Sequence, residues 1–522
     1  MVTAPPHIIV VGAGMGGLAT AIRLGSAGAR VTVLETADGP GGKMRTLPSA
    51  AGPVDAGPTV VTMRHQFDAL FELTGKPTEN WVHFSPEPLL ARHWWPDGSS
   101  LDLFADQEAS VEAIKRFAGL QEAMAFRSFT KRAARLFKAF ETPMMETAKP
   151  TLFGMFATTA PNPRLAREMS PLSSLASMLK RTFKDPRLQQ LFGRYATYVG
   201  GHPLQTPAVL QLIWHAEASG VWRVEGGMSA LADALKRAAE SLGVEFRFAT
   251  PVRKIETQAG HVNAVQTASG DRILADAVVF NGDPAALFEG LLGPTASQAV
   301  SRKNISPRSL SARVWAFAAE ANGADLAHHN VFFGHDPRTE FRPIARGQPP
   351  DDPTLYVCAQ DRGTGLTPPT LERFEIIENA APSSDADTKE KETCRTRVFD
   401  LLADRGLTFS PRPDLAALTI PADFHELFPG SQGSLYGKSP KGMMAAFDRP
   451  TAQSRVPGLY LAGGGTHPGA GIAMAALSGR HAAEAIAEDL ALPSPSHRTA
   501  TPGGTLTASP IAGLRPSRSS PS

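Results

Sequence analysis

The chain has 522 residues, of which 42% are hydrophobic and 20% are charged, values that exclude a fully disordered chain, a collagen-like chain and a coiled coil. Its 52 Lys and Arg residues against 50 Asp and Glu residues give a formal net charge of +2, far from the basic excess typical of nucleic-acid-binding proteins. At roughly 150 residues per domain, we expect a globular protein of about two to four domains with no nucleic-acid partner.

The first predicted unit is a strand, a turn, a helix and a second strand. Residues 1–7 hold no Lys or Arg, so they lack the basic start of a signal peptide. Residues 7–11 are a continuous apolar run, which is typical of a buried parallel strand. Residues 12–17 form a glycine-rich turn, residues 18–27 a helix of small side chains, and residues 29–35 the second strand.

The turn matches the GxGxxG pattern, and its context is the one that the pattern requires. Its residues are Gly12, Ala13, Gly14, Met15, Gly16 and Gly17. Gly12 permits the tight turn, Gly14 lets the backbone approach a pyrophosphate, and Gly17 lets helix and strand pack closely. The phosphates then meet unpaired N–H groups at the positive end of the helix dipole. We therefore predict that this turn binds an adenine dinucleotide.

An acidic residue completes the pattern, because Glu35 falls 23 positions after Gly12, at the end of the second strand. Its carboxylate is placed to accept hydrogen bonds from the adenosine ribose hydroxyls, and its charge would repel a 2′-phosphate. This argues against NADP as the ligand.

A basic residue follows on a second glycine turn, Gly41-Gly42-Lys43. A cation so close to the fingerprint is within reach of the pyrophosphate or the flavin, so Gly42 and Lys43 are candidate cofactor-binding residues. The alternative is a lysine on a solvated surface.

From about residue 106 to 206 the pattern is helical, with proline-rich joints. One stretch, residues 122–141, places five cations on one side, namely Arg127, Lys131, Arg132, Arg135 and Lys138. The opposite side carries an apolar stripe of Phe126, Phe129, Ala133, Leu136, Phe137 and Phe140. Two interpretations stay open: a helix that binds an anionic membrane surface, or an ordinary amphipathic helix whose aromatic face lies in the core.

The middle of the chain alternates helix and strand. A helix is predicted at residues 228–241, strands at 244–248 and 252–255, and a hairpin of 262–267 with 272–280. Further predicted elements are strands at 312–317 and 355–359, a loop at 382–391 and a helix at 394–404. The two cysteines, Cys358 and Cys394, have no metal-ligand or CxxC spacing, so we expect reduced thiols in a cytosolic protein and no metal site.

A second glycine-rich segment lies near the other end. Residues 456–479 are uncharged, but seven glycines and two prolines favour a strand, a loop and a helix start over a membrane span. A helix N-terminus aimed at the pyrimidine edge of a flavin would stabilise the reduced ring, which favours FAD over NAD. The candidate residues here are Gly464, Gly465, Gly471, Ile472 and Met474.

The same loop contains His467, which could touch flavin or substrate, although a lone histidine is more often structural. The final helix is predicted at residues 473–490, and residues 491–522 are predicted to be disordered. We identify no catalytic acid or base, because no Ser-His-Asp, Cys-His or paired-carboxylate spacing occurs.

These motifs, together with Asp55-Ala-Gly-Pro58, resemble the FAD-dependent carotenoid desaturases of the bacterial phytoene-desaturase type. The resemblance spans residues 7 to about 490, and segments 55–63, 220–228 and 466–471 are most similar to the 1-hydroxycarotenoid 3,4-desaturase branch, which serves pigment synthesis in photosynthetic bacteria. No Asp follows Tyr460-Leu-Ala-Gly463, which departs from the wider flavin amine oxidase group and leaves the ribityl contact unassigned.

The resemblance implies a reaction, a fold and a location. The reaction is introduction of the C-3,4 double bond into a 1-hydroxycarotenoid such as 1-hydroxyneurosporene, by hydride transfer to flavin, with oxygen or a quinone as electron acceptor. The fold is α/β (α+β overall), a Rossmann-like FAD-binding domain of the flavin amine oxidase/desaturase type with a second substrate domain of mixed sheet and helices. The enzyme would be cytoplasmic and peripherally attached to the anionic surface of the inner photosynthetic membrane, where its water-insoluble substrate resides.

We expect the FAD-binding domain to comprise residues 1–100, 226–300 and 450–490, and the substrate-binding, membrane-facing region to comprise 101–225 and 301–449. Two alternatives remain within enzymes, a phytoene-type carotene desaturase and a carotenoid isomerase. An alternative of another class is a non-enzymatic isoprenoid-binding protein of the escort type, which the intact glycines and Glu35 argue against.

Overall fold

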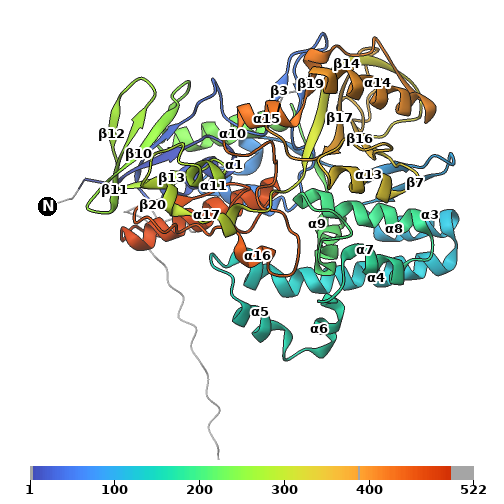
Figure 1. Cartoon of the computed structure of the whole chain (residues 1–522), viewed down its shortest axis with the longest axis horizontal. Helices are drawn as coiled ribbons and strands as arrows, with labels where there is room; N and C mark the ends of the chain where they lie inside the picture. Colours follow the sequence, from blue (N-terminus) through green and yellow to red (C-terminus); the bar gives the residue numbers. More distant parts are fainter. Residues whose placement is uncertain (1–3, 386–387, 495–522) are drawn as a thin grey trace, which may run out of the picture.

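The computed structural model describes residues 4–385 and 388–494, and the predicted disordered tail lies outside the described residues from residue 495 on. Two sheets lie side by side in the molecule, and a layer of helices lies beneath the second one (Figure 1).

The first sheet is parallel and contains five strands in the order β20-β13-β1-β2-β9. Its strands are β1 (His7–Val11), β2 (Arg30–Leu34), β9 (Glu245–Arg247), β13 (Ala277–Phe280) and β20 (Leu459–Leu461). Ile8, Ile9 and Val10 are fully buried: Ile8 and Val10 belong to a helix-rich core on one face of the sheet, whereas Ile9 packs on the other face with Ile255 and Val265 of a small antiparallel sheet. The predicted α/β fold, with a parallel sheet that contains the first two strands of the chain, is confirmed.

Three helices that are distant in sequence pack together beside this sheet (Figure 1). They are α1 (Met15–Ser26), α10 (Met228–Ser241) and α17 (Ile472–Asp489). The helix predicted at 228–241 has the bounds expected from its apolar periodicity, and those predicted at 18–27 and 473–490 shift by one to three residues. The segment 456–479 forms β20, a loop and the start of α17, as predicted.

The predicted hairpin is wrong in its second strand. Residues 272–280 divide into β12 (Arg272–Leu274), which pairs with β11 (His261–Thr267), and β13, which joins the first sheet between β1 and β20. The break follows from burial: Val278 and Val279 are fully buried as in a parallel sheet, whereas β12 lies at the edge of a small antiparallel sheet with β10 (Val252–Gln258).

The second sheet has eight strands in the order β18-β14-β17-β16-β15-β6-β7, and β19 pairs with β14. Its strands are β6 (Leu89–Trp94), β7 (Ser100–Phe104), β14 (Ser311–Gly323), β15 (His329–Phe332), β16 (Leu355–Ala359), β17 (Glu372–Ala380), β18 (Leu407–Ser410) and β19 (Leu418–Thr419). Helix α14 (Thr388–Asp404) covers one face through Val398 and Leu402. It begins six residues earlier than predicted, so the predicted loop 382–391 is wrong at its end.

The other face of this sheet points toward the first part of the molecule. His329, Cys358, Glu375 and Ala316 lie opposite one another on four neighbouring strands, so they share one face. Ala316 packs against Val54 and Ala56 of the segment that follows the second glycine turn. This face therefore lies against the segment that contains β4 and links the second sheet to the N-terminal part of the chain.

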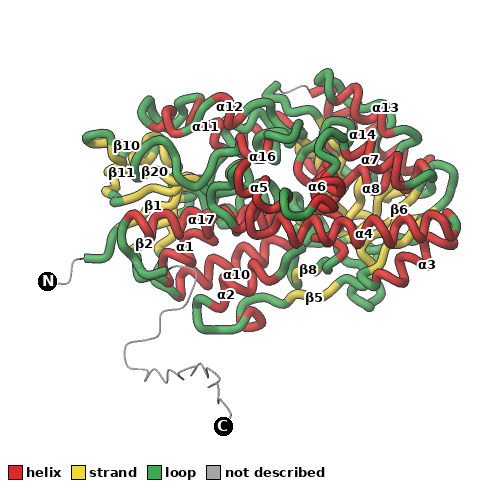
Figure 2. The backbone as a smooth tube through the Cα atoms, turned by 90° about the horizontal axis from the view of Figure 1, so that it is seen from below, coloured by secondary structure: helices red, strands yellow, loops and turns green. Residues whose placement is uncertain are grey.

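The predicted helical region, residues 106–206, is confirmed. It forms α3 (Gln107–Ala118), α4 (Leu120–Phe140), α5 (Leu152–Thr159), α6 (Pro163–Met169), α7 (Leu175–Thr182) and α8 (Pro186–Gly193), and α9 (Ile213–Ala218) follows. Prolines occupy the first turn of α6 and α8, where a missing N–H costs nothing. Seen from below, α5 and α6 lie on the face turned to the reader (Figure 2).

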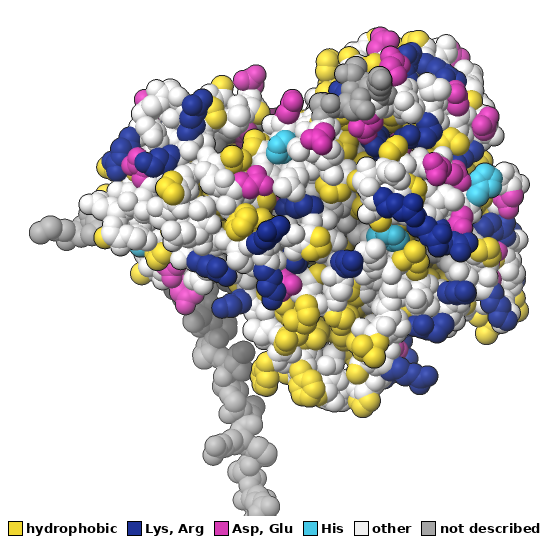
Figure 3. All heavy atoms as spheres, in the orientation of Figure 1, with side chains coloured by type: hydrophobic (Ala, Val, Ile, Leu, Met, Phe, Trp, Pro, Cys, Tyr) yellow, Lys and Arg dark blue, Asp and Glu magenta, His cyan; other side chains and the backbone are white. Residues whose placement is uncertain are grey.

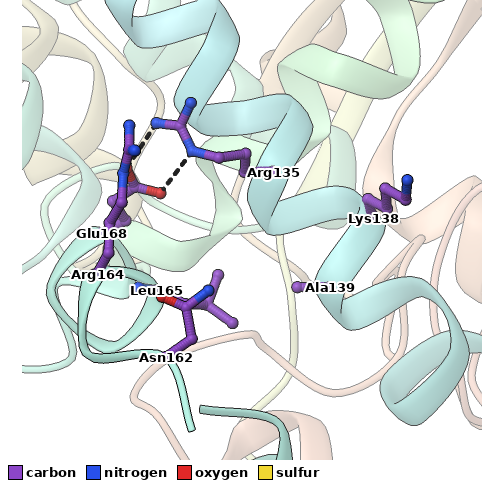
Figure 4. A pocket seen from close by; sticks show the side chains of 7 residues that line it. All are labelled: Arg135, Lys138, Ala139, Asn162, Arg164, Leu165 and Glu168. Atoms are coloured by element: carbon purple, nitrogen blue, oxygen red, sulfur yellow. Dashed lines mark hydrogen bonds and ion pairs between the residues drawn. The ribbon is translucent and has the colours of Figure 1, made fainter.

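The amphipathic helix α4 has its aromatic face in the core, so the hypothesis that this face binds a membrane is wrong. Phe126, Phe129, Leu136 and Phe140 are at most 3% exposed. The cations opposite are largely paired: Arg127 donates to Glu108 at 2.5 Å, and Arg135 donates twice to Glu168, at 3.1 and 2.6 Å, beside a surface cavity of ≈ 210 Å³ (Figure 4). Among the described residues, no helix combines the length and apolar character needed to cross a bilayer.

Shorter elements connect these layers. They are β3 (Thr46–Leu47), β4 (Val54–Asp55), α2 (His65–Glu72), β5 (Phe84–Pro86), β8 (Trp222–Val224), α11 (Pro284–Phe288), α12 (Arg302–Ile305), α13 (Pro337–Ile344), α15 (Pro421–Leu427) and α16 (Ala445–Asp448). The boundaries that we expect between the two domains stay a prediction.

Candidate cofactor site

The fingerprint turn leads from β1 into α1 and leaves the start of that helix without a cap. Gly14 is the N-cap residue, and no side chain accepts a hydrogen bond from the first turn. The backbone N–H groups of this turn are therefore free to bind an anion, and the helix dipole favours one there. Gly12 has φ = 102°, and a Cβ on Gly17 would stand 2.1 Å from the Gly12 carbonyl oxygen, so both positions require glycine.

Glu35 lies directly after β2, as predicted, and is half-buried. Its carboxylate accepts hydrogen bonds from the backbone N–H of Ala13, at 2.6 Å, and of Ala37, at 2.9 Å. The first bond ties the acidic residue to the fingerprint itself. A carboxylate offers about four lone-pair sites, so Glu35 retains acceptor capacity for ribose hydroxyls.

The second glycine turn packs on the first. Gly41 donates to the carbonyl of Ala13 at 2.9 Å, and Gly42 has φ = 58°. The side chain of Lys43 is half-buried, and its Nζ donates to the Leu435 carbonyl at 2.5 Å. Burial lowers the pKa of Lys43 to about 8. The alternative of a solvated surface lysine does not fit this position.

Two further cations close to Lys43 have no motif in the sequence that would reveal them. Arg308 forms a buried ion pair with Asp283. Arg449 donates to the carbonyls of Gly464 at 3.1 Å, Tyr436 at 2.9 Å and Lys438 at 2.8 Å, and burial lowers its pKa to about 10. Arg449 therefore holds the C-terminal glycine loop in place.

That loop brings the second uncapped helix to the site. Helix α17 begins after Gly471, which has φ = 103° and serves as the N-cap without a side-chain hydrogen bond. Ile472 and Met474 lie half-buried in its first turn against the core around α1. Gly464 and Gly465 precede it, and a Cβ on Gly465 would stand 2.6 Å from Pro284.

His467 has a structural role. It is 2% exposed, its Nε2 lies 2.9 Å from the carbonyl oxygen of Thr147, and its ring stacks on His481 at 5.6 Å. Burial lowers its pKa to about 4, so the imidazole is neutral at physiological pH.

These residues fit a flavin dinucleotide. Two uncapped helix N-termini, α1 and α17, and a half-buried Lys43 supply N–H groups and positive charge for a pyrophosphate and for the electron-rich end of a ring. Glycine has no side chain that would keep a ligand away from the backbone. At Gly471 the space beside the backbone is open, since a Cβ there would meet no atom within 4 Å.

Opposite the cofactor half, the second sheet carries polar groups that the sequence did not indicate. Glu375 is 0% exposed, and neither of its carboxylate oxygens has a hydrogen-bond partner among the described residues. Burial raises the pKa of Glu375 well above its ordinary value, and nearby Asp55 raises it further. A neutral carboxylic acid therefore faces the interior beside the site.

The fold also brings Cys358 beside His328 and His329, which sequence spacing could not indicate. Their ligand atoms lie within 4.8 Å of one another, an arrangement able to hold a metal ion. One nitrogen of each ring is already engaged, because Nδ1 of His328 lies 3.0 Å from the Arg362 carbonyl and Nδ1 of His329 lies 2.7 Å from the Tyr356 hydroxyl. Nε2 of His328 lies 3.7 Å from Sγ of Cys358.

Comparison with known proteins identifies the chain's relatives. The family model of flavin containing amine oxidoreductases matches residues 15–487. The chain is 56% identical to a hydroxyneurosporene desaturase of Cereibacter sphaeroides over 93% of this chain and 98% of that protein. It is 52% identical to one of Rhodobacter capsulatus over 92% of this chain and 98% of that protein.

Among solved structures, an oxidoreductase from Methanosarcina mazei has a TM-score of 0.58 at 17% identity, covering 92% of this chain and 100% of that one, which shows the shared fold. The family match and the geometry agree on the cofactor: the chain is an oxidoreductase that binds FAD.

Proposed function

The chain belongs to the family of flavin-containing amine oxidoreductases, and from that premise we propose that it desaturates an acyclic hydroxycarotenoid. The substrate that we propose is a 1-hydroxycarotenoid such as 1-hydroxyneurosporene, which would gain its C-3,4 double bond. The observation that carries this proposal is the 56% identity to a hydroxyneurosporene desaturase across nearly the whole of both chains.

Bound FAD supplies the redox chemistry, the acceptance of a hydride from a –CH2–CH2– unit. We propose that the chain holds it through the two uncapped helix N-termini and through Glu35 and Lys43. In this proposal the residues of the fingerprint, Gly12 to Gly17, contact the pyrophosphate. The Glu35 carboxylate accepts hydrogen bonds from the ribose hydroxyls. The contacts at the flavin end come from Gly42, Gly464, Gly465, Gly471, Ile472 and Met474.

The second sheet contributes positioning. Its inner face lies against segment 54–56, so a substrate between sheet and cofactor would be shielded from water. A reaction that removes hydrogen from an unactivated chain depends chiefly on holding that chain in one orientation. We assign no catalytic acid or base.

The other enzyme activities and the non-enzymatic alternative have less support. A phytoene-type desaturase or an isomerase is not favoured, since relatives at 56% and 52% identity are hydroxyneurosporene desaturases. A non-enzymatic escort-type protein is opposed by the match to a flavin-containing oxidoreductase family and by the two uncapped helix starts.

The test is expression in cells that make 1-hydroxyneurosporene, followed by pigment analysis. A product with a longer chromophore and a new 3,4 double bond is expected. Conversion of phytoene alone, or an unchanged chromophore, would contradict the substrate that we propose. Purified protein without flavin absorption would favour the escort alternative.

We further propose peripheral attachment to the anionic surface of the inner photosynthetic membrane, because the substrate must be loaded from lipid. Support comes from α5, whose Leu152, Phe153 and Phe156 side chains are 47%, 80% and 66% exposed. Figure 3 shows hydrophobic side chains gathered at this end of the molecule with cations near them. Such a surface fits insertion into a bilayer interface.

We propose that either oxygen or a quinone accepts the electrons from the reduced flavin. Reoxidation of the reduced enzyme under anaerobic conditions with a quinone, against reoxidation in air, decides between them.

A further inference from the structure

A small cavity lies between the second sheet and the helical layer, and its lining is unusually polar. Its volume is ≈ 10 Å³, room for about one water-sized group. The surrounding core is apolar, since Leu90 and Val221 belong to a cluster of buried hydrophobic residues. Five polar side chains nevertheless line it: Arg194, Tyr198, Glu217, His329 and Tyr356.

One wall is a network around a buried carboxylate. Glu217 is 4% exposed and accepts hydrogen bonds from the hydroxyls of Tyr195, at 2.6 Å, and Tyr198, at 2.5 Å. Arg194 donates to the Tyr198 hydroxyl at 3.2 Å and balances the charge of Glu217. Its Nε has no hydrogen-bond partner among the described residues. This wall therefore keeps an unused donor and a carboxylate with spare acceptor capacity.

The opposite wall is a chain of three hydrogen-bonded side chains, His329, Tyr356 and Thr59. The Tyr356 hydroxyl lies 2.7 Å from Nδ1 of His329 and 2.7 Å from the Thr59 hydroxyl. His329 is 2% exposed, and burial lowers its pKa well below the usual value, so the ring is neutral and its two nitrogens act as one donor and one acceptor. Its Nε2 makes no hydrogen bond within the described chain.

The cavity adjoins the cofactor site through the segment that carries Thr59. Two residues earlier, Gly57 packs so tightly on the second glycine turn that a Cβ there would stand 1.9 Å from the Lys43 carbonyl oxygen. On the other side, Gly200, two residues after Tyr198, packs against Tyr436, whose carbonyl Arg449 binds. Both walls are thus anchored to residues at the flavin end.

We propose that this cavity is the subsite for the hydroxyl group of the hydroxycarotenoid, an inference that rests on the proposed function. A tertiary alcohol offers one donor and two acceptors, which the unused donor of Arg194, the carboxylate of Glu217 and Nε2 of His329 match. A polyene end without the hydroxyl leaves these buried groups unpaired, which opposes its binding. The hydroxyl thereby selects the substrate and fixes which end of it meets the flavin.

The experiment uses the purified, FAD-loaded full chain with 1-hydroxyneurosporene or neurosporene in vesicles. The wild type should prefer the hydroxylated substrate by at least about 100-fold in kcat/KM. Tyr198→Phe should lower this preference about 10- to 100-fold, through loss with 1-hydroxyneurosporene and not with neurosporene. Tyr195→Phe is the matched control, because it removes the other hydroxyl from Glu217 but does not line the cavity, so it should keep the preference.

Tyr356→Phe provides a second variant should Tyr198→Phe fail to retain FAD or to fold, and it should lower the preference in the same way. Equal conversion of both substrates by the wild type, or equal effects of Tyr198→Phe on both, would overturn the subsite while the desaturase function stands. Conversion of neither substrate by the FAD-loaded wild type would overturn the proposed function and the subsite together.

Discussion

The backbone nitrogen of Gly463 lies 2.5 Å from the point where a Cβ on Gly16 would stand. The fingerprint helix and the C-terminal glycine loop, more than 440 residues apart in sequence, are therefore in direct backbone contact. Gly479 completes this contact from α17, since a Cβ there would stand 2.5 Å from the Gly16 carbonyl oxygen. One contact thus sets the separation of the two helix starts that would share the cofactor.

The first prediction concerns this contact. Gly16→Ala forces backbone atoms apart, so we expect a loss of about 1–3 kcal/mol in the free energy of unfolding and weaker FAD retention. Chemical denaturation and the flavin-to-protein absorbance ratio measure both. Gly39→Ala is the matched control, because a Cβ at Gly39 meets no atom within 4 Å. Equal stability of the two variants would contradict the packing argument.

The second prediction concerns Lys43, whose pKa burial lowers to about 8 from the ordinary 10.5. Between these values the unfolded chain binds a proton that the folded chain does not, so the unfolding free energy of the apoprotein should rise with pH from about 8 to about 10.5. Lys43→Met should remove that rise. Denaturant midpoints of both proteins across this range test it, and parallel pH profiles would contradict it.

The sequence predicted the local elements of the cofactor half well. The apolar run of β1, the glycine turn and the start of α1 are contiguous, so their spacing alone indicates the structure. Helix α10 was equally predictable from sequence, because its apolar residues recur with the spacing of a helix from Met228 to Ser241.

The second sheet was harder to predict, and β17 was missed altogether. Buried Glu375 and Glu378 lie within this strand, so its sequence lacks the apolar alternation of a half-buried strand. Strands β6 and β7 were missed although they pair as a local antiparallel hairpin. The parallel pairing of β6 with β15, more than 230 residues away, has no local pattern that encodes it.

Within the site, the residues in glycine motifs could be predicted from sequence, and the isolated charged residues could not. Glycine motifs mark where backbone meets cofactor, whereas Arg449 and Asp283 are isolated residues placed by tertiary contacts. The polar cavity draws its lining from segments near residues 60, 90, 195, 217, 329 and 356. Val60 and Val221 lie in segments that carry the family resemblance, but the five polar side chains of the lining lie outside every motif.

The third prediction concerns Glu375, whose carboxyl burial keeps protonated in the folded protein. The unfolded chain loses that proton near its ordinary pKa of 4.5, so the wild-type unfolding free energy should fall relative to Glu375→Gln as pH rises above that value, by up to about 1.4 kcal/mol per pH unit. Denaturant unfolding of both proteins between acid and neutral pH measures the difference. Glu320→Gln, at an exposed position of β14, should show no such trend.

The fourth prediction concerns the exposed surface of α5. Replacing Leu152, Phe153 and Phe156 by Ser removes three large apolar side chains that contribute little to the core, so folding and FAD content should be retained. Partitioning onto anionic vesicles should fall at least about tenfold, because each side chain gains about 1–3 kcal/mol when it leaves water. Co-sedimentation with vesicles measures it. Leu274→Ser with Leu366→Ser is the control, since these side chains are 61% and 77% exposed in β12 and in the loop before β17, and this variant should bind as the wild type does. If the α5 variant still sediments with vesicles, another surface makes the contact.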